Sequence, residues 1–508
     1  MKNKKKINKK RNTGESFIDK IRRLEEEKRL EDNNSLNILS RTTLNKRLVY
    51  VMVFFVVIFM ILALYLVYFQ LFQRASIEND SHNRRLWVNE DNIKRGDIID
   101  RNGNILAYNE TDYDGSQYRV YNYGQVASSI TGYSSMTYGK TGIEKTYNKQ
   151  LLALSGDGFS NFRKMVIKND TGYNVELTTD INIQEIVYKH MQNVKGSCVI
   201  MDPRTGDVLA LVSNPSFDPN TVDDDWDYLI QNTDGPLVNR ATSGSYRPGS
   251  TFKIVTATGI LSSGIDTSYQ DTGSETIQGY EIRNFADQVF GMVNLRSAFV
   301  NSINTYFAAK TDVMGSNSFE KLAEKFMINK DYPFDLDKKN AKIPFNDLNQ
   351  VDLAMTGFGY GKTEITPLHM AMISSSIANE GIMMKPRLVK KVFDEEGKII
   401  EEKKVEELSE VASAYDANYI RDLMVAVVNE GTGTQAYLDS VQIAGKTGTA
   451  DKNDGLLDAW FVGFAPAYDP KLAIALVVED SDDTGGETAA PIARDIISDI
   501  YENINLDY

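Results

Sequence analysis

The chain of 508 residues is poor in the residues that form disulfides and metal sites, since it contains one cysteine and three histidines. Cys198 has no partner for an intrachain disulfide, and the apolar run "CVIM" around it is typical of a buried strand rather than of a reactive thiol. The histidines at positions 82, 190 and 369 lie far apart and lack the spacing of metal ligands. We therefore expect neither a metal site nor a Ser-His-Asp triad, unless the fold brings these histidines together.

Positive charge is scarce outside the N-terminal segment. Residues 1–47 hold 15 Lys and Arg against 7 Asp and Glu, a balance of +8. The rest of the chain carries 41 basic and 63 acidic residues, a balance of −22. Such an acidic body argues against general nucleic-acid binding. The basic segment could form a charged helix or a solvated tail, and we favour the tail.

One long apolar run follows the basic segment. Residues 48–69 contain no charge, and as a helix they would span roughly 33 Å, enough for a bilayer core of about 30 Å. Tyrosines near both ends suit the membrane interface. A cleaved signal peptide would have a shorter apolar region and a small-x-small site, and we find neither. We therefore expect a single-pass anchor at residues 47–72. By the positive-inside rule, we also expect a cytoplasmic basic tail at 1–46 and an extracytoplasmic remainder.

The remainder divides into two segments that differ in composition and in predicted secondary structure. Residues 73–177 are rich in Tyr, Asn, Gly and Ser and hold no nucleophile-base set, so we expect a spacer domain, with a hairpin turn at Asn102-Gly103. Residues 178–508 predict a helix, a hairpin around a turn at 202–206, a mostly helical middle, three successive strands and a last helix. This order favours an α+β fold in which helices flank an antiparallel sheet.

The stretch "RPGSTFKIVTATG" places Ser250 three residues before Lys253, at the start of a largely apolar helix. The spacing puts both side chains on one helix face, and burial would lower the pKa of Lys253, as a general base at neutral pH requires. Free N–H groups at the helix start suit an oxyanion. The competing interpretation is an N-cap serine with a lysine that extends to solvent. The motif alone does not decide, because Ser318 and Lys321 repeat it.

Two further motifs follow in the same segment. Ser302 and Asn304 lie two residues apart near a predicted helix start. The third motif, on a predicted strand, comprises Lys446, Thr447, Gly448 and Thr449. We expect Gly448 to leave room for a substrate backbone. Each triplet alone is weak, as a stray "KTG" at residues 140–142 shows, but only these three occur in order within one segment.

Ser-x-x-Lys, Ser-x-Asn and Lys-Thr-Gly in this order resemble the motifs of the penicillin-binding proteins and serine β-lactamases. The stretch "RGDIIDRNGNILA" at residues 95–107 resembles the opening of the pedestal domain in class B penicillin-binding proteins. "TGFGYGKTEITPLHMAM" at 356–372, "GKTGTA" and "WFVGFAP" resemble the transpeptidase domain of that class. The resemblance covers nearly all of the chain after the anchor. It implies a pedestal, or dimerisation-like, domain at 73–177 and a penicillin-binding-protein/β-lactamase-like transpeptidase domain at 178–508.

The resemblance also implies a reaction, the cross-linking of peptidoglycan stem peptides by a serine D,D-transpeptidase. Ser250 would attack the D-Ala-D-Ala carbonyl and form an acyl-enzyme, and Lys253 would take its proton. Ser302, helped by Lys446, would relay a proton to the leaving amine. Asn304 would hold Lys253 and the substrate amide. β-Lactams would acylate the same serine, and no cofactor is implied.

The remaining implied roles concern substrate binding. Thr447, Gly448 and Thr449 would line the substrate, and the two threonines would bind its terminal carboxylate. The backbone N–H groups of Ser250 and Thr449 would form the oxyanion hole. The family also implies a polytopic membrane glycosyltransferase as partner, in cell-wall synthesis for cell shape, cell division or sporulation. Two alternatives stay open, a D,D-carboxypeptidase and a β-lactam-hydrolysing or β-lactam-sensing protein of the same fold. We find no "ExxLN" loop of a class A β-lactamase after Ser302.

Overall fold

The structure is a computed structural model that describes residues 16–69, 93–113, 115–154, 171–452 and 455–506. The chain falls into two compact units, residues 1–80 and residues 81–508, which are described separately below. Parts of each expected segment lie outside the described residues, namely positions 1–15 of the tail, 70–72 of the anchor, 73–92, 114 and 155–170 of the pedestal, and 453–454 and 507–508 of the transpeptidase domain.

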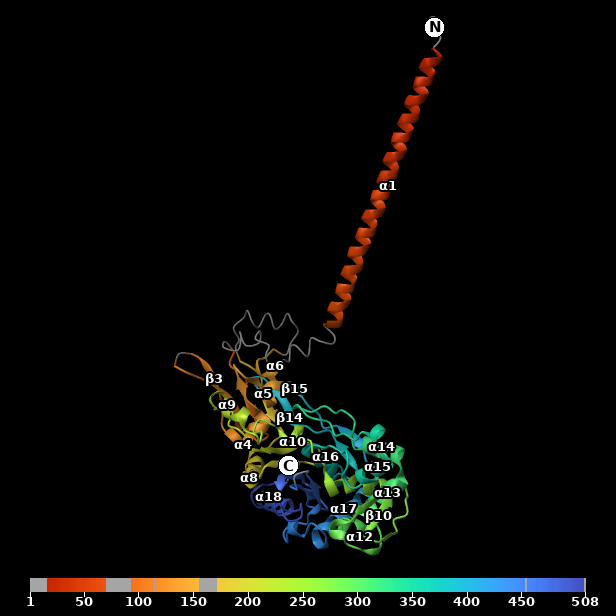
Figure 1. Ribbon diagram of the computed structural model, residues 1–508. Coiled ribbons are helices and arrows are strands. Elements are labelled where there is room, and N and C mark those ends of the chain that lie inside the picture. Colours follow the sequence, from red (N-terminus) through yellow and green to blue (C-terminus); the bar gives the residue numbers. More distant parts are fainter. Residues whose placement is uncertain (1–15, 70–92, 114, 155–170, 453–454, 507–508) are drawn as a thin grey trace, which may run out of the picture. The chain divides into compact units, whose positions relative to one another are not determined.

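Among the described residues, the first unit contains one helix, α1 (Phe17–Tyr68), which joins the charged segment and the apolar run without a break (Figure 1). At its start the backbone N–H of Ile18 donates to Ser16 Oγ at 3.4 Å. Our preference for a solvated tail is therefore wrong for the residues from 17 onward. Leu, Glu, Lys and Arg are strong helix formers, and the apolar helix that follows removes one fraying end. Within the described residues, Asn45–Tyr68 is the one helical stretch long and apolar enough to cross a membrane.

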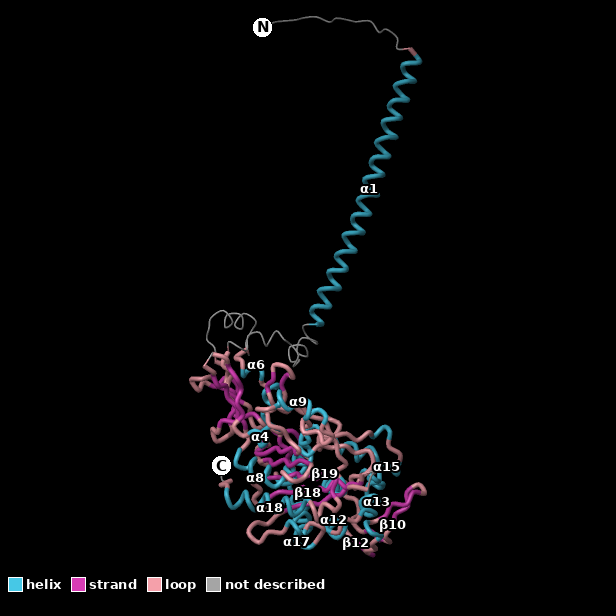
Figure 2. The backbone as a smooth tube through the Cα atoms, turned by 60° about the vertical axis from the view of Figure 1, so that its left-hand side comes forward, coloured by secondary structure: helices cyan, strands magenta, loops and turns pink. Residues whose placement is uncertain are grey.

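A five-stranded antiparallel sheet organises the second unit, in the order β17-β18-β19-β7-β8 (Figure 2). The hairpin expected around residues 202–206 consists of β7 (Gly196–Met201) and β8 (Val208–Asn214). The three expected strands are β17 (Ala444–Asp451), β18 (Leu457–Ala465) and β19 (Leu472–Ser481). The antiparallel sheet predicted from the sequence is confirmed, and β17 forms one of its edges.

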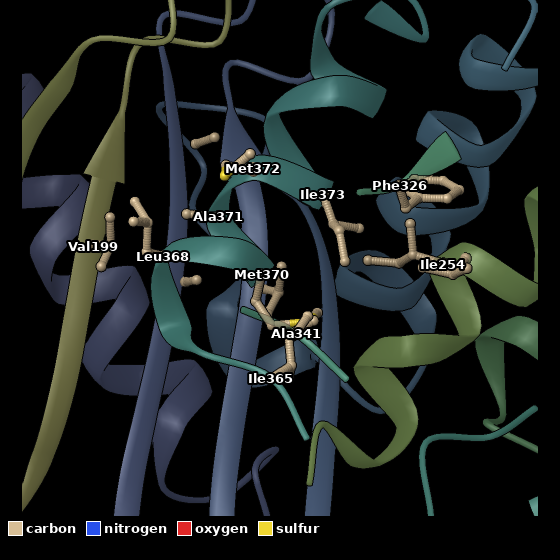
Figure 3. Close-up of a cluster of buried hydrophobic side chains, with 14 of the residues drawn as sticks. Val199, Ile254, Phe326, Ala341, Ile365, Leu368, Met370, Ala371, Met372 and Ile373 are labelled. Atoms are coloured by element: carbon tan, nitrogen blue, oxygen red, sulfur yellow. The ribbon is translucent and has the colours of Figure 1, made fainter. Parts of the chain in front are cut away.

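Helices cover both faces of this sheet. One face packs against α8 (Ile181–Met191) and α18 (Ala489–Asn503), and the other against α16 (Pro367–Ala378). Figure 3 shows how α16 fills the space between layers, with Leu368 beside Val199 of β7 and Ile373 beside Ile254 on the far side. Cys198 is fully buried on the opposite face of β7, and burial raises the pKa of its thiol, as expected for a structural residue.

The middle of the chain is helical in its long elements but also contains short strands that we did not predict. Its helices are α9 (Val222–Gln231), α10 (Arg240–Ser243), the 3-10 helix η3 (Gly249–Phe252), α11 (Lys253–Ser262), α12 (Leu295–Val300), α13 (Asn304–Met314), α14 (Ser316–Lys325), α15 (Gln350–Thr356) and α17 (Ala414–Glu430). Its short strands are β9 (Tyr269–Asp271), β10 (Ser274–Ile277), β11 (Tyr280–Arg283), β12 (Gly291–Val293), β13 (Ile382–Met384) and β16 (Glu407–Glu410).

A second sheet, of six strands, lies at the N-terminal side of this unit in the order β15-β14-β6-β1-β2-β3. Its strands are β1 (Ile98–Ile99), β2 (Ile105–Thr111), β3 (Gln117–Tyr121), β6 (Asn174–Leu177), β14 (Val389–Phe393) and β15 (Ile399–Glu402). The expected hairpin at Asn102-Gly103 is confirmed by the antiparallel β1–β2 pair. The strands β14 and β15 come from the segment in which we expected only the second domain. The small elements α4 (Gly124–Thr131), β4 (Ser134–Ser135), β5 (Gly139–Lys140), α5 (Gly142–Thr146) and α6 (Asn148–Leu151) lie between β3 and β6.

A buried ion-pair network joins β3 to α5 in this region. Glu144 is fully buried and accepts hydrogen bonds from Arg95 Nε at 2.6 Å and from Arg119 Nε at 2.7 Å. Burial acts to raise the pKa of Glu144, but the two guanidinium groups outweigh it and hold that pKa below its ordinary value. The carboxylate therefore stays charged, and its removal would take away a negative charge that two buried cations share.

Candidate active site

Ser250 and Lys253 lie on two consecutive short helices. Ser250 is the second residue of η3, and Lys253 begins α11. Pro248, not Ser250, occupies the N-cap position, and the side chain of Lys253 is 0% exposed. The competing interpretation, an N-cap serine with a lysine that extends to solvent, is therefore wrong.

The amine of Lys253 points at the Ser-x-Asn motif. Its Nζ lies 2.6 Å from the carbonyl oxygen of Ser302, 3.1 Å from Ser302 Oγ and 2.8 Å from Asn304 Oδ1. The ring of Phe307 closes the other side, with its centroid 5.3 Å from Nζ. The fold thus brings Lys253 and Asn304 together, whereas the hydroxyl of Ser250 makes no hydrogen bond to any residue that the structure describes.

Ser302 lies between two buried lysines. Its hydroxyl oxygen is 3.1 Å from Lys253 Nζ and also 3.1 Å from Lys446 Nζ. The backbone of Ser302 has φ 58°, in the left-handed region that costs a non-glycine residue about 1–3 kcal/mol. Such strain is typical of functional sites, where the surrounding contacts hold one side chain in place.

Both lysines have pKa values below that of an ordinary lysine. Burial lowers the pKa of Lys253 well below its ordinary value, and the nearby charge of Lys446 lowers it further. Burial also lowers the pKa of Lys446, to about 7. Since the charge of Lys446 acts on Lys253, the proton that the pair retains is held by Lys446 while Lys253 is a free base. The neutral amine of Lys253 can therefore accept a proton, and the charged amine of Lys446 can donate one, through the hydroxyl of Ser302 between them.

The strand that carries Lys446 packs directly on the turn that carries Ser250. A Cβ at Gly448 would lie 2.8 Å from Pro248 O and 2.8 Å from Thr251 Cγ2. On the facing turn, Gly249 has φ +53°, and a Cβ there would lie 2.5 Å from Thr449 O. We expected Gly448 to leave room for a substrate backbone, and in the structure Pro248 and Thr251 take that room. These two glycines therefore permit the close approach of β17 to η3.

The two threonines of the third motif lie on the face of β17 opposite to Lys446, as strand alternation requires. Thr447 Oγ1 shares a hydrogen bond of 2.6 Å with Thr432 Oγ1. Thr449 Oγ1 accepts a hydrogen bond of 3.1 Å from the backbone N–H of Gly485. Because β17 is an edge strand, a ligand that lies along its edge can reach both faces.

The sequence analysis missed three residues that support this edge. Thr432 and Gly485 are the partners of the two threonines, and Tyr360 donates from its hydroxyl to Thr449 O at 3.3 Å and to Asp451 Oδ2 at 3.0 Å. Tyr360 belongs to the stretch at 356–372 that resembled the family, so a signal existed for it. Thr432 and Gly485 lie in runs of small polar residues that carried no recognisable pattern.

The described residues contain no cluster of three His, Cys, Asp or Glu side chains that could hold a metal ion. His190 contacts Asp499 Oδ2 at 2.8 Å, and His369 contacts the carbonyl oxygen of Phe326 at 2.7 Å. Burial lowers the pKa of His369 to about 4, so it is neutral at pH 7. Both histidines therefore serve local packing, and His82 lies outside the described residues.

Two family models match the chain. Residues 196–498 match the penicillin binding protein transpeptidase domain, and residues 95–175 match the penicillin binding protein A dimerisation domain. The first match spans the sheet and all three motifs, and the second spans the strands β1 to β3 and the buried Glu144.

Curated proteins and solved structures agree with these matches. The chain is 32% identical over 470 residues to the peptidoglycan D,D-transpeptidase PbpA of Mycolicibacterium smegmatis, which covers 84% of this chain and 93% of that protein. It resembles the D,D-transpeptidase domain of a peptidoglycan glycosyltransferase from Eggerthella lenta, with a TM-score of 0.74 and 33% identity. This match covers 81% of the present chain and 99% of that structure. The ceftriaxone acyl-enzyme of penicillin-binding protein A from M. tuberculosis matches with a TM-score of 0.74 and 32% identity. This match covers 81% of the present chain and 99% of that structure.

Proposed function

The chain belongs to the penicillin-binding-protein transpeptidase family, as a serine-type peptidoglycan D,D-transpeptidase of class B, and we propose that Ser250 is its acyl-forming nucleophile. One observation supports this assignment above the others, the hydroxyl of Ser302 held at 3.1 Å from each of two fully buried lysine amines. Ser250 stands one helical turn before the first of these lysines, and its hydroxyl is left without a partner among the described residues.

The two lysines divide the proton transfers between them in this proposal. Lys253, neutral because of burial and of the charge on Lys446, takes the proton of the attacking Ser250 hydroxyl. Its two N–H groups donate to the carbonyl of Ser302 and to Asn304 Oδ1, and its lone pair must turn from Ser302 Oγ to the hydroxyl of Ser250. Ser302 then delivers its proton to the leaving amine and takes a proton from Lys446. The released D-Ala therefore carries the proton of Ser302, while the proton that Ser250 gave up stays on Lys253, so the two lysines together still hold one proton.

Residues of β17 and of the start of η3 bind the substrate. The backbone N–H groups of Ser250 and Thr449 stabilise the oxyanion, and each such donor is worth about 3–4 kcal/mol in acyl-transfer enzymes. Their separation is fixed by the close approach that Gly249 and Gly448 allow. The hydroxyls of Thr447 and Thr449 bind the terminal carboxylate of a D-Ala-D-Ala stem peptide, and Asn304 contacts its amide. The same residues bind β-lactams, which acylate Ser250.

We also propose an organisation for the whole chain. Residues 1–46 form a cytoplasmic basic tail, 47–72 a single-pass anchor, 73–177 a pedestal domain and 178–508 the transpeptidase domain. The apolar helix over Asn45–Tyr68 supports the anchor, and the excess of Lys and Arg before it supports a cytoplasmic N-terminus. In this arrangement the catalytic domain lies outside the cell. The anchor and pedestal then offer surfaces for a polytopic membrane glycosyltransferase that supplies glycan strands.

The test is intact-mass spectrometry of the full-length protein in detergent after exposure to benzylpenicillin, with Ser250→Ala beside the wild type. We expect a stable mass increase of one penicillin molecule on the wild type and none on the variant. Ser318→Ala, at the repeat of the Ser-x-x-Lys pattern on α14, is the matched control and should be acylated like the wild type. Acylation of Ser250→Ala would refute the nucleophile assignment.

The alternatives give different time courses in the same experiment. An adduct that forms and disappears within seconds would identify a β-lactam-hydrolysing protein. A stable adduct, followed by release of D-Ala from a pentapeptide without any dimer, would identify a D,D-carboxypeptidase. A cross-linked dimer from two stem peptides is the outcome that we expect.

A further inference from the structure

A cavity of about 290 Å³ lies at the outer edge of the six-stranded sheet, beside β3. Its size is near the lower end of ligand pockets in proteins, which fits one ring-sized group better than a large ligand. Its walls come from β2, β3, β4 and the start of α9, and include Asn109, Gln117, Tyr118, Arg119, Tyr133 and Asp223. None of its lining residues belongs to the site around Ser250.

Two polar atoms on β3 have no hydrogen-bond partner among the described residues, Arg119 Nη2 and Gln117 Oε1. The side chain of Arg119 is 7% exposed, and its Nε is held by Glu144. Gln117 is fixed through its other end, because Nε2 donates to Thr111 Oγ1 at 2.8 Å. Both residues point to the same face of β3, since they are two positions apart. Both atoms are buried in the cavity wall, and buried polar atoms are nearly always paired, so a side-chain rotation that brings them to the cavity would offer a ligand one donor and one acceptor.

The charges around the cavity cancel. Two guanidinium groups, those of Arg95 and Arg119, face the fully buried carboxylate of Glu144, and Asp223 adds a second negative charge at the rim. An anionic or cationic ligand would therefore gain little from the local field, and an uncharged ligand is favoured. Hydroxyl groups suit these two atoms, because a hydroxyl can accept from the guanidinium or donate to the amide oxygen.

Three of the lining residues are tyrosines, and the buried Tyr121 and Tyr133 give the cavity an aromatic wall. Tyr118 directly follows Gln117 and so leaves the other face of β3, where it is 48% exposed and donates a hydrogen bond of 2.7 Å to Glu110 Oε2. Aromatic rings present apolar faces beside polar groups, which matches a ligand with C–H faces and hydroxyl edges. We propose that this cavity binds one sugar ring of the glycan strand whose stem peptides the enzyme cross-links. The identity of the polymer rests on the proposed function, whereas the sugar chemistry rests on the cavity itself.

Calorimetric titration of the full-length protein in detergent with a tetramer of N-acetylglucosamine tests this proposal. We expect saturable binding to the wild type that is weakened at least about five-fold by Gln117→Met and by Tyr118→Ala, since each removes one contact. Tyr113→Ala is the matched control, because this tyrosine lies between the same two strands, is fully exposed and does not line the cavity. Thermal unfolding confirms that each variant is folded.

The outcomes separate this proposal from the proposed function. Acylation by benzylpenicillin, measured on the same samples, reports on Ser250 alone and should be equal in all four proteins. No saturable binding to the wild type, or binding that survives both substitutions, would overturn the sugar site. Inorganic phosphate that binds in place of the sugar and is lost in the same variants would make the cavity an anion site and refute the sugar assignment.

A second inference rests on a different observation, the way in which the start of α13 is held. Thr305 directly follows Asn304, and its side-chain Oγ1 donates to Asp271 Oδ1 at 2.7 Å. Its backbone N–H donates to Asn284 Oδ1 at 3.1 Å. Asn304 itself donates from Nδ2 to the carbonyl of Arg283 at 3.4 Å. The segment from β9 to β12 therefore holds Asn304 and Thr305, the first two residues of α13.

The carboxylate of Asp271 connects these contacts. It is fully buried and also accepts hydrogen bonds from Asn284 Nδ2 at 2.9 Å and from the backbone N–H of Phe290 at 2.7 Å. Burial acts to raise the pKa of Asp271, but the hydrogen bonds outweigh it and keep that pKa below its ordinary value. Its carboxylate is thus charged and acts only as an acceptor. We propose that Asp271 is a positioning residue that keeps Asn304 Oδ1 at 2.8 Å from Lys253 Nζ.

Asp271→Asn tests this role, because the amide keeps the shape but replaces one acceptor by a donor that opposes Asn284 Nδ2. We expect the rate constant of acylation by benzylpenicillin to fall about ten-fold in the folded full-length protein. When the contact to Asn304 is lost, Lys253 loses an acceptor that stabilises its protonated form, so the pKa of Lys253 falls. The acidic limb of the pH profile of acylation should then move to lower pH. Lys446, the other charged group that faces Lys253, is unchanged by the substitution.

Asp266→Asn is the control, since this nearby carboxylate bonds only within its own turn, to Ser268. It should keep both the rate and the pH profile of the wild type. A slower Asp271→Asn with an unchanged pH profile, or a loss that follows the fraction of unfolded protein, would show a merely structural role. Wild-type acylation by Asp271→Asn would overturn the inference as well.

Discussion

Gly448→Ala measures how closely the strand β17 must lie against the turn that carries Ser250. The added Cβ would lie 2.8 Å from Pro248 O and 2.8 Å from Thr251 Cγ2. Non-bonded carbon contacts are best at about 3.5–4.0 Å, so the strand and the turn must separate by roughly half an ångström or more. The oxygen of Pro248 belongs to the backbone and cannot rotate out of the way.

The size of the effect follows from that separation. Overpacking of a close-packed contact costs typically about 1–3 kcal/mol, which should appear as a lower free energy of unfolding. The separation also moves the N–H of Thr449 relative to the hydroxyl of Ser250. Because a misplacement of about 1 Å costs on the order of 100-fold in rate, we expect acylation to slow by about ten-fold.

The assay is the second-order rate of acylation by a fluorescent penicillin, beside thermal unfolding of the same samples. Gly445→Ala, on the same strand, is the matched control, because its Cβ would meet only the ring of Phe461, 2.3 Å from Cζ, on the opposite face. This control should lose stability without slower acylation of the folded protein. Equal rates for Gly448→Ala and the wild type, or equal losses in both variants, would refute the reasoning.

Three further predictions concern charged and polar side chains. Lys446→Gln removes the charge that lowers the pKa of Lys253, so the rise of acylation with pH should begin at higher pH, as a series of stopped-flow measurements would record. Ser302→Ala removes the hydroxyl between the two amines and should slow acylation by about 10²–10⁴-fold with unchanged thermal unfolding; a smaller loss would exclude a proton relay. Glu144→Gln removes the buried charge that Arg95 and Arg119 share and should lower the free energy of unfolding in urea by about 3–5 kcal/mol. Because the pKa of Glu144 is lowered in the folded state, the wild type should lose this stabilisation as pH falls through that lowered value, and the variant should show no such loss.

The three motifs could be predicted because each is local. A helix places Ser250 and Lys253 on one face through their spacing alone, and burial of an apolar turn around a lysine is visible in the sequence. Alternation along a strand likewise separates Lys446 from Thr447. The antiparallel sheet followed from the order of apolar segments, and the structure confirms it.

The parts that sequence reasoning missed are contacts between distant segments. Nothing in the pattern around Thr447 indicates that its hydroxyl meets Thr432, and nothing around Asp271 indicates Thr305. The reason for Gly448 was also hidden, since the atoms that need its missing side chain belong to residue 248 and to Thr251. Periodicity reports which face of an element is buried, but not which element covers it.

The pairing of β14 with β6 has a consequence for the order in which the chain can fold. Val389 lies opposite Leu177, so one edge of β6 finds its partner only after about 210 further residues have been made. At about 5–20 residues per second, that interval lasts roughly 10–40 s. During this time β6 presents unpaired backbone groups that can join another chain. A fragment that stops before β14 should therefore aggregate rather than fold, because this edge of β6 stays unpaired.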